Sequence, residues 1–388
     1  MIGKNKVILM GSDHHNGLGL VRSFGVNGVN PIGIIICENT KKSFVCKSRY
    51  WEEVWCVKDE VEAIELLIRK YSDEKLKPVI IPWSDKMASV IDNNVNKLKL
   101  NFIIPSIGGQ EGAICDLMDK QKQVEFCKVN GLNVLDSSIY VLEEGIALLD
   151  NINYPVILKP VASVEGEKLD IKVCFSREEL ENSFDLFKQK NYSRVLVQRY
   201  LQERIEYVLT GAVAKNFISY TIVSHNRQWP NKTGSGSFSI FEVDELVKKY
   251  AEHCLEVIIE KGYEGTIDIE FFKDNQDNFY LNEINWRSSG RNFVSLYTEV
   301  YSAYQYYNKI TGKRVESKLI NEKQGYSMNE ATDLRHVLCG RLGCVQWLKD
   351  LMKTGSYALW YKKDIKPTVF RYCYLVKELI SRKKILKL

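Results

Sequence analysis

The chain has 388 residues, more than one ordinary domain holds, and suits two or three domains. Hydrophobic residues make up 45% of it and charged residues 27%, a balance that excludes a disordered or fibrous protein. The net charge of +5 is uneven, because residues 330–388 carry 13 Lys and Arg against 5 Asp and Glu. This excess of +8 leaves about −3 for residues 1–329, which argues against a nucleic-acid-binding enzyme body.

Targeting and redox signals are weak. The opening segment MIGKNKVILMGSDHH has a four-residue apolar run, too short for a signal peptide. No apolar stretch approaches the ~18 residues that span a bilayer. The ten cysteines form no CxxC pair and no zinc-finger spacing, so we expect reduced thiols. These features predict a cytoplasmic protein, with association to the inner face of a membrane as an alternative.

The first hundred residues alternate short apolar runs with segments of helical periodicity. Strands are predicted at Lys6–Met10, Pro31–Cys37, Pro78–Trp83 and Leu100–Pro105, and helices at Gly17–Val26, Glu60–Tyr71 and Asp85–Leu98. Such alternation favours an open parallel α/β sheet covered on both faces. A glycine-containing segment at 17–22 is similar to part of a dinucleotide fingerprint. Arg22 stands where the third glycine should be, so NAD binding is not favoured.

The next two hundred residues mix strands and helices in a different order. Helices are predicted at Asp116–Asn130, Ser176–Lys190 and Glu242–Lys261, and strands at Asn133–Leu135, Tyr154–Pro160, Leu169–Cys174, Val195–Leu201, Glu206–Val213, Gly265–Phe272 and Asn278–Asn285. Ser176 followed by Glu179 forms a capping box. The polar segment Ser224–Ser239 has little periodicity and predicts a mobile loop.

Polar side chains share faces on the two predicted strands near residue 270. Asp268 and Glu270 lie two residues apart on one strand, and Glu283, Asn285 and Arg287 alternate along the next. Pairing these strands sets Glu270 beside Glu283 and Asn285, an oxygen cage that suits Mg2+ bridging phosphates. Arg287 is then placed for an anion. An ordinary amphipathic hairpin with solvent-facing polar residues is the alternative.

Upstream segments add candidates for nucleotide binding. Lys159 ends an apolar strand, and the short loop 161–168 that follows is able to fold over phosphates with its backbone N–H groups. Gln198 interrupts another apolar strand, as an adenine-holding hinge does. Glu206 follows it and is placed to hold ribose hydroxyls.

The order and spacing of these segments resemble the ATP-grasp superfamily over residues 116–291, on the motifs MDK, YPVILKP, VLVQRYL and GTIDIEFF…FYLNEINWR. The resemblance implies an ATP-grasp fold of the α/β and α+β classes, in four parts. These are an N-terminal open parallel preATP-grasp domain at 1–112, a small lobe at 113–202, a large lobe with an antiparallel sheet and the metal site at 203–325, and a basic C-terminal helical extension at 326–388.

The resemblance also implies a role for each matching position. The nucleotide-binding residues would be Lys120 and Lys159 on the phosphates, Ser163 and Gly166 in the phosphate loop, Gln198 with the backbone of Arg199 and Leu201 at adenine, and Glu206 at ribose. Glu270, Glu283 and Asn285 would bind two Mg2+ ions, for which Mn2+ can substitute. Two departures stand out: the hinge usually carries Glu in place of Gln198, and the phosphate loop has a single glycine.

The resemblance implies an ADP-forming ligase that joins a carboxylate to an amine through an acyl phosphate. A finer similarity to the carboligases that include D-aspartate ligase points to an amino-acid ligase of cell-wall or surface-polysaccharide metabolism. The carboxylate substrate is a small molecule or lipid-linked, and a homodimer is compatible with the sequence. Alternatives are a bicarbonate-activating enzyme similar to carbamoyl-phosphate synthetase and a non-catalytic ATP-binding sensor.

Catalytic cations are predicted at Arg227, Arg287 and Arg291. Arg287 and Arg291 suit a carboxylate or the transferring phosphate. Arg227 belongs to Ser224–Ser239, which we predict to be a lid that excludes water from the acyl phosphate, with an ordinary loop as the alternative.

Two further segments carry weaker signals. Asp13 follows the first strand and is a candidate amine-binding group. His14 and His15 are less favoured as metal ligands, because no third ligand is near in sequence. The basic and apolar residues from 375 onward suit either an anionic membrane surface or a surface helix packed on the body.

Overall fold

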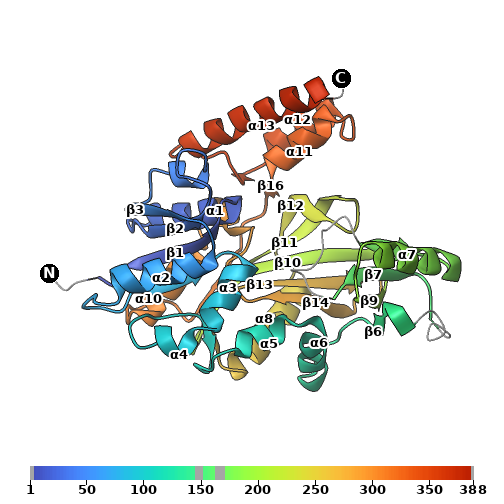
Figure 1. The fold of residues 1–388 in the computed structure, drawn as a ribbon, viewed down its shortest axis with the longest axis horizontal. Coiled ribbons are helices and arrows are strands. Elements are labelled where there is room, and N and C mark those ends of the chain that lie inside the picture. Colours follow the sequence, from blue (N-terminus) through green and yellow to red (C-terminus); the bar gives the residue numbers. More distant parts are fainter. Residues whose placement is uncertain (1–3, 145–151, 162–170, 386–388) are drawn as a thin grey trace.

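The computed structural model describes residues 4–144, 152–161 and 171–385, which form three sheets with helices around them (Figure 1). The N-terminal sheet is parallel, with strand order β3-β2-β1-β4. Its strands are β1 (Val7–Ser12), β2 (Ile32–Ile36), β3 (Glu53–Val57) and β4 (Val79–Pro82), and its helices are α1 (His15–Gly25), α2 (Glu60–Tyr71), α3 (Asp85–Asp92) and α4 (Val95–Leu98). The strands are apolar on both faces because each face packs against its own hydrophobic cluster.

Several elements differ from those predicted. The apolar run at Leu100–Pro105 makes only an isolated bridge, Val79 with Ile103, among the described pairings. The next strand, β5 (Ser106–Ile107), pairs with β13 (Tyr263–Asp274). The helix predicted at Asp116–Asn130 is two helices, α5 (Ala113–Met118) and α6 (Lys120–Val129), because Asp119 caps α6 with its side chain. Strand β3 was missed, since its sequence EVWCV is short and mixed.

An antiparallel sheet with order β6-β9-β7-β8 forms the small lobe. Its elements are β6 (Ser137–Val141), β7 (Val156–Pro160), β8 (Lys172–Cys174), α7 (Arg177–Gln189) and β9 (Arg194–Arg199). Half of the predicted capping box is confirmed, since Ser176 Oγ accepts from the Glu179 amide at 3.2 Å. The Glu179 carboxylate accepts from the Phe175 amide at 2.8 Å, one residue before the position that a capping box uses.

The large antiparallel sheet is built on β10 (Arg204–Ala214), β11 (Phe217–Trp229), β12 (Ser235–Glu242), β13 (Tyr263–Asp274) and β14 (Phe279–Asn285). Helix α8 (Glu245–Glu260) packs on it through the largest hydrophobic cluster. Three short strands extend it: β15 (Lys318–Ile320), β16 (Tyr326–Met328) and β17 (Ser356–Tyr357). Parallel α/β and antiparallel sheets therefore occur together, which confirms the predicted fold class.

The prediction of an irregular loop at Ser224–Ser239 is wrong. Strands β11 and β12 pair through most of this segment, with a bulge near Arg227. The Trp229 ring stacks on His336 with centroids 3.7 Å apart, and Arg227 forms ion pairs with Asp333 and Asp350. These contacts with distant residues stabilise a polar sequence as a strand, which local composition does not reveal.

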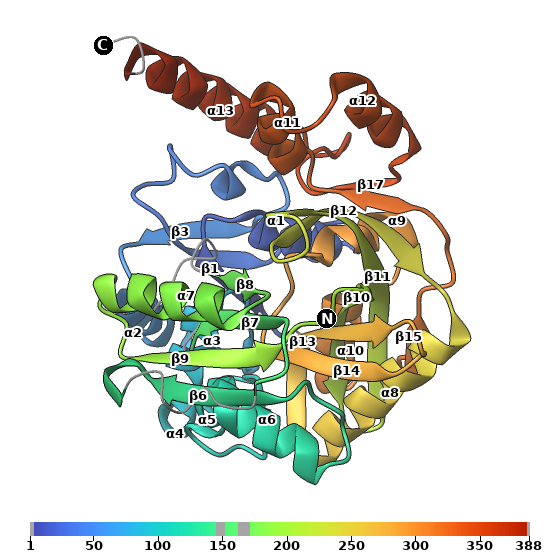
Figure 2. The same ribbon diagram turned by 90° about the vertical axis from the view of Figure 1, so that its right-hand side faces the viewer.

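Helices α11 (Glu330–Leu338), α12 (Cys344–Lys353) and α13 (Lys366–Ile385) lie together at one end of the molecule (Figures 1 and 2). A fully buried ion pair ties this end to α1, since Arg22 Nε donates to Asp364 Oδ2 at 2.9 Å. The position that departs from the dinucleotide fingerprint is therefore structural. No helix in the described part of the chain is both long enough and apolar enough to cross a membrane.

Candidate active site

A cavity of about 850 Å3 lies where the parallel sheet, the small lobe and the large sheet meet. Nine of the residues predicted from sequence line it together: Lys120, Lys159, Gln198, Glu206, Glu270, Glu283, Asn285, Arg287 and Arg291. These residues are spread over 170 positions of sequence, so only the fold brings them together. We call this space the central cavity.

Two lysines line the central cavity at the small lobe. Lys159 ends β7, and its Nζ donates to Gln198 Oε1 on the neighbouring strand β9 at 3.0 Å. Lys120 begins α6, and its Nζ donates to the Pro160 carbonyl at 3.1 Å. Burial, with the Lys120 ammonium as the second cause, lowers the pKa of Lys159 to about 8. The two lysines thus concentrate positive charge at a partly buried site, where a bound anion would offset the free-energy cost of burying that charge.

The predicted adenine hinge is placed in part. Gln198 is buried at the cavity wall, whereas the next side chain, Arg199, points into a second cavity of about 920 Å3, as alternation along β9 requires. The Arg199 amide donates to the Asp136 carbonyl at 2.8 Å and is not free for adenine. Leu201 also lines the second cavity. Ser163 and Gly166 lie outside the described residues.

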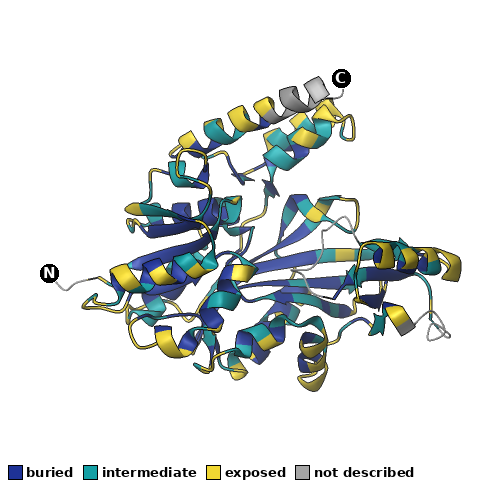
Figure 3. Cartoon of the chain, in the orientation of Figure 1, coloured by how far each residue is buried: buried dark blue, intermediate teal, exposed yellow. Residues whose placement is uncertain are grey.

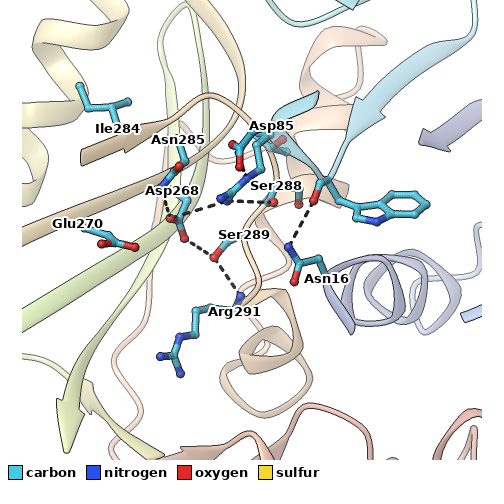
Figure 4. A network of polar contacts seen from close by, with 12 residues as sticks. Asn16, Asp85, Asp268, Glu270, Ile284, Asn285, Ser288, Ser289 and Arg291 are labelled. Carbon is cyan, nitrogen blue, oxygen red and sulfur yellow. Dashed lines mark hydrogen bonds and ion pairs between the residues drawn. The ribbon is translucent and has the colours of Figure 1, made fainter. Parts of the chain in front are cut away.

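Strands β13 and β14 pair in the register that the sequence predicts, with Glu270 opposite Glu283 and Asp268 opposite Asn285. Asn285 Nδ2 donates to Asp268 Oδ1 at 3.0 Å, so Asp268 orients the amide and leaves Asn285 Oδ1 as an acceptor (Figure 4). No group of three or more His, Cys, Asp or Glu is arranged for a metal ion among the described residues. The candidate magnesium ligands are therefore two carboxylates and one amide oxygen.

Asp268 is a site residue to which sequence reasoning assigned no role. Besides Asn285 it accepts from the Ser289 hydroxyl, and its Oδ1 lies 3.9 Å from Arg287 Nη1. Ser289 Oγ in turn accepts from the Arg291 amide at 2.9 Å. One buried carboxylate therefore fixes both the metal strand and the turn that carries the two arginines (Figure 4).

Arg287 joins the large sheet to the parallel domain. Its Nε donates to Asp85 Oδ1 at 3.0 Å, at the start of α3. Burial opposes the charge, but Asp85 and Asp268 hold the pKa of Arg287 above its ordinary value. The guanidinium therefore stays charged at the cavity wall.

Arg291 is held by the β11–β12 hairpin. Its guanidinium donates to Ser239 Oγ at 3.0 Å and to the Gly236 carbonyl at 2.9 Å, and Nη2 lies 2.8 Å from His225 Nε2. A Cβ on Gly236 would lie 2.2 Å from Arg291 Nη2, so only glycine permits this approach.

His225 links Arg291 to Glu206. His225 Nδ1 lies 3.3 Å from Glu206 Oε1, and burial lowers the pKa of His225, which favours the neutral ring. His225 Nδ1 also lies 2.9 Å from Gln228 Nε2, so the ring contacts Arg291 on one side and Glu206 and Gln228 on the other. Burial opposes ionisation of Glu206, yet His225 holds its pKa below the ordinary value. The predicted ribose contact is thus also part of an arginine-positioning network.

The far end of the central cavity contains residues with weaker sequence signals. Asp13 Oδ1 already accepts from Ser43 Oγ at 2.6 Å and from the Val45 amide at 3.2 Å. The rings of His14 and His15 lie 4.0 Å apart, and burial places the pKa of His15 well below its ordinary value. No third metal ligand joins them in the described part of the chain.

Helices α11 and α13 also reach this end of the cavity, through Arg335, His336, Arg371 and Leu375. Sequence reasoning missed these four residues, because they lie outside every motif and more than 40 positions beyond the last of them.

The structure places Arg227, a predicted catalytic cation, away from the central cavity. Its Nη2 donates to Asp333 Oδ2 at 2.7 Å and its Nη1 donates to Asp350 Oδ2 at 2.9 Å, and it is absent from the described cavity lining. His225 and Arg227 are two positions apart and would share one face of a regular strand, but a bulge between them shifts the register, and only His225 is in the described cavity lining. Arg227 fastens the hairpin to α11 and α12.

Comparison with known proteins places the fold. Residues 119–298 match the family model described as the carbamoyl-phosphate synthase L chain, ATP binding domain. The 2-oxoglutarate carboxylase small subunit of Hydrogenobacter thermophilus is 28% identical over 191 residues, covering 46% of this chain and 40% of that protein. The mitochondrial propionyl-CoA carboxylase alpha chain of Caenorhabditis elegans is 26% identical over 196 residues, covering 47% and 26%. The chain thus aligns with well under half the length of these curated relatives.

Solved structures match over most of the chain. N5-carboxyaminoimidazole synthetase from Staphylococcus aureus superposes with a TM-score of 0.65 at 18% identity, covering 87% of this chain and 86% of that one. An L-amino acid ligase from Bacillus licheniformis gives a TM-score of 0.63 at 13% identity, covering 84% and 79%. These likenesses show that the chain has the fold of these two proteins, and residues 119–298 are similar to the matched family.

Proposed function

We propose that the chain is an ATP-dependent ligase that phosphorylates a carboxylate and joins the acyl group to an amine, releasing ADP and phosphate. The observation that carries the proposal is the central cavity itself. It places two lysines, a pair of facing glutamates and two arginines, Arg287 and the buried Arg291, around one space. Phosphoryl transfer needs little covalent help from a protein, and its main requirements are positioning and neutralisation of charge.

The charge of each cavity residue indicates which part of MgATP it would contact. Lys120 and Lys159 are placed to bind the outer phosphates of ATP, and Gln198 and Glu206 to hold the nucleoside. Glu270, Glu283 and Asn285 offer oxygen atoms, which fit Mg2+, and Asp268 holds the amide in place for it. Bound Mg2+ would neutralise charge on the phosphates.

Arg287 and Arg291 are placed at the reacting group. A substrate carboxylate oxygen held by Arg291 attacks the γ-phosphorus, the bond to ADP breaks, and an acyl phosphate forms. The amine then attacks the acyl carbon, loses a proton, and phosphate leaves with the carboxylate oxygen. His225 and Gly236 keep the Arg291 guanidinium in this position and exclude water from one side of it.

A second candidate, activation of bicarbonate, is favoured by the family match to a carbamoyl-phosphate synthase domain. However, the central cavity extends past Arg291 to α13, and this space favours an acid larger than bicarbonate. An amino-acid ligase of cell-wall or surface-polysaccharide metabolism, acting as a homodimer in the cytoplasm, remains our prediction.

Phosphate release from MgATP separates these functions. We expect release when pooled amino acids and sugar acids are supplied, and none when bicarbonate alone is supplied. Release with bicarbonate alone would favour the second candidate. ATP binding without hydrolysis under any condition would favour a non-catalytic sensor. The Lys159→Met variant serves as the control for contaminating ATPases.

A further inference from the structure

Exposed apolar side chains concentrate at the end of the molecule formed by α11 to α13. Sixteen large hydrophobic residues are exposed in the described part of the chain, and nine of them lie between positions 338 and 376. They are Leu338, Val345, Leu348, Met352, Trp360, Ile365, Val369, Tyr374 and Val376. We call this set the C-terminal face. Exposed turns follow one another along α13 in Figure 3.

Helical spacing groups these residues into stripes. Val345, Leu348 and Met352 share one side of α12, and Val369 and Val376 share one side of α13. The opposite side of α13 carries Arg371 and Leu375, which line the central cavity. Helix α13 therefore has one side in the cavity and an apolar side facing outward.

The charges around these stripes are almost all positive at the surface. Residues 330–388 contain five acidic residues, and four of them are buried in contacts with arginines or backbone amides: Glu330, Asp333, Asp350 and Asp364. Exposed cations flank the stripes at Lys349, Lys362, Lys363, Lys366 and Lys377. The buried acids cannot balance them outside, so the C-terminal face is both apolar and cationic.

We propose that the C-terminal face binds the surface of an anionic lipid bilayer. Apolar side chains ringed by lysines are the composition that inserts shallowly among anionic headgroups. A second copy fits poorly, because two such faces would bring the exposed lysines of both copies together, while Glu330, Asp333, Asp350 and Asp364 are buried. Docking would be peripheral, since no described helix crosses a membrane.

Co-sedimentation with vesicles tests the proposal. The full chain is mixed with vesicles of phosphatidylcholine alone or with about one third phosphatidylglycerol. We expect binding only to the anionic vesicles, weakened at least tenfold by about 1 M salt. The double variant Lys349→Glu/Met352→Ser should bind at least about tenfold more weakly, because each lysine near such a surface contributes about 1 kcal/mol.

The matched control is Lys128→Glu/Val129→Ser on α6, where Val129 is 79% exposed, the same as Met352. This control should bind like the wild type, and both variants should keep wild-type ATP binding. Equal binding to both vesicle types, or unchanged binding of the α12 variant, would overturn the proposal. So would a wild-type chain that ignores vesicles but dimerises through this face, or one that binds only an acidic protein.

Discussion

Replacing Lys159 with Met should stabilise the folded protein while removing its affinity for ATP. The Lys159 ammonium carries an energetic cost in the absence of an anion, because burial and Lys120 lower its pKa from 10.5 to about 8. That drop corresponds to a penalty of about 3 kcal/mol on the charged form. Loss of the hydrogen bond to Gln198 should cost the variant about 1 kcal/mol. The free energy of unfolding at pH 7 should therefore be about 2 kcal/mol higher for the variant than for the wild type.

The extra stability of the Lys159→Met variant should decrease as the pH rises. Below about pH 8 the lysine is charged in both the folded and the unfolded chain, so the full penalty is present. Between about pH 8 and 10.5 the folded chain has lost the proton that the unfolded chain keeps. The free energy of unfolding of the wild type therefore rises with pH in this window, and the advantage of the variant fades.

Thermal unfolding and calorimetry measure the two effects. At pH 7 the unfolding midpoint should rise by roughly 2 °C, because the unfolding entropy of a chain of this length converts about 2 kcal/mol into a shift of that size. Affinity for a nonhydrolysable ATP analogue should fall at least tenfold, about 1.4 kcal/mol. Lys188→Met, on the exposed side of α7 in the same lobe, should change neither quantity. A destabilised Lys159→Met variant, or one with unchanged affinity, would refute the reasoning.

Three further predictions follow from named contacts. Glu283→Gln should lower magnesium-dependent phosphate release about a hundredfold while the fold stays intact. The control Glu256→Gln, on α8, should leave phosphate release unchanged. Near-normal turnover of Glu283→Gln at low magnesium would show that the β13–β14 hairpin has only a structural role. Arg227→Met should leave Asp333 without its cation and Asp350 with Lys353 alone, and should cost about 3 kcal/mol of stability with nucleotide affinity unchanged. Urea unfolding and calorimetry measure the two effects, and weaker ATP binding without destabilisation would restore the catalytic assignment of Arg227. Asp364→Ala should leave Arg22 buried and uncompensated at a cost of about 3 to 5 kcal/mol, seen as a lower unfolding midpoint, and the double variant with Arg22→Ala should recover part of it.

Local sequence patterns predicted most strands and helices because their signals are local. Continuous apolar runs predicted β1, β2, β4 and β7, and a capping residue marked the start of α7. Alternation predicted the polar faces of β13 and β14, and a bulge between Glu270 and Phe271 shifts the register so that Glu270 lies opposite Glu283.

The errors come from contacts between distant parts of the chain. The segment at 224–239 is polar and glycine-containing, yet it is a hairpin because α11 and α12 supply acids for Arg227 and a ring for Trp229. Asp268 has no special local signal, and its role depends on Asn285, Ser289 and Arg287 meeting around it. The cavity residues of α11 and α13 could not be found for the same reason.

The most direct test of the proposed reaction follows an oxygen atom. The acid that stimulates phosphate release is prepared with a heavy-oxygen label in its carboxylate and incubated with MgATP and the amine pool. Attack on the γ-phosphorus followed by displacement at the acyl carbon must carry one carboxylate oxygen into the released phosphate. We therefore expect labelled inorganic phosphate together with ADP. Labelled AMP, or phosphate without the label, would contradict an acyl-phosphate ligase.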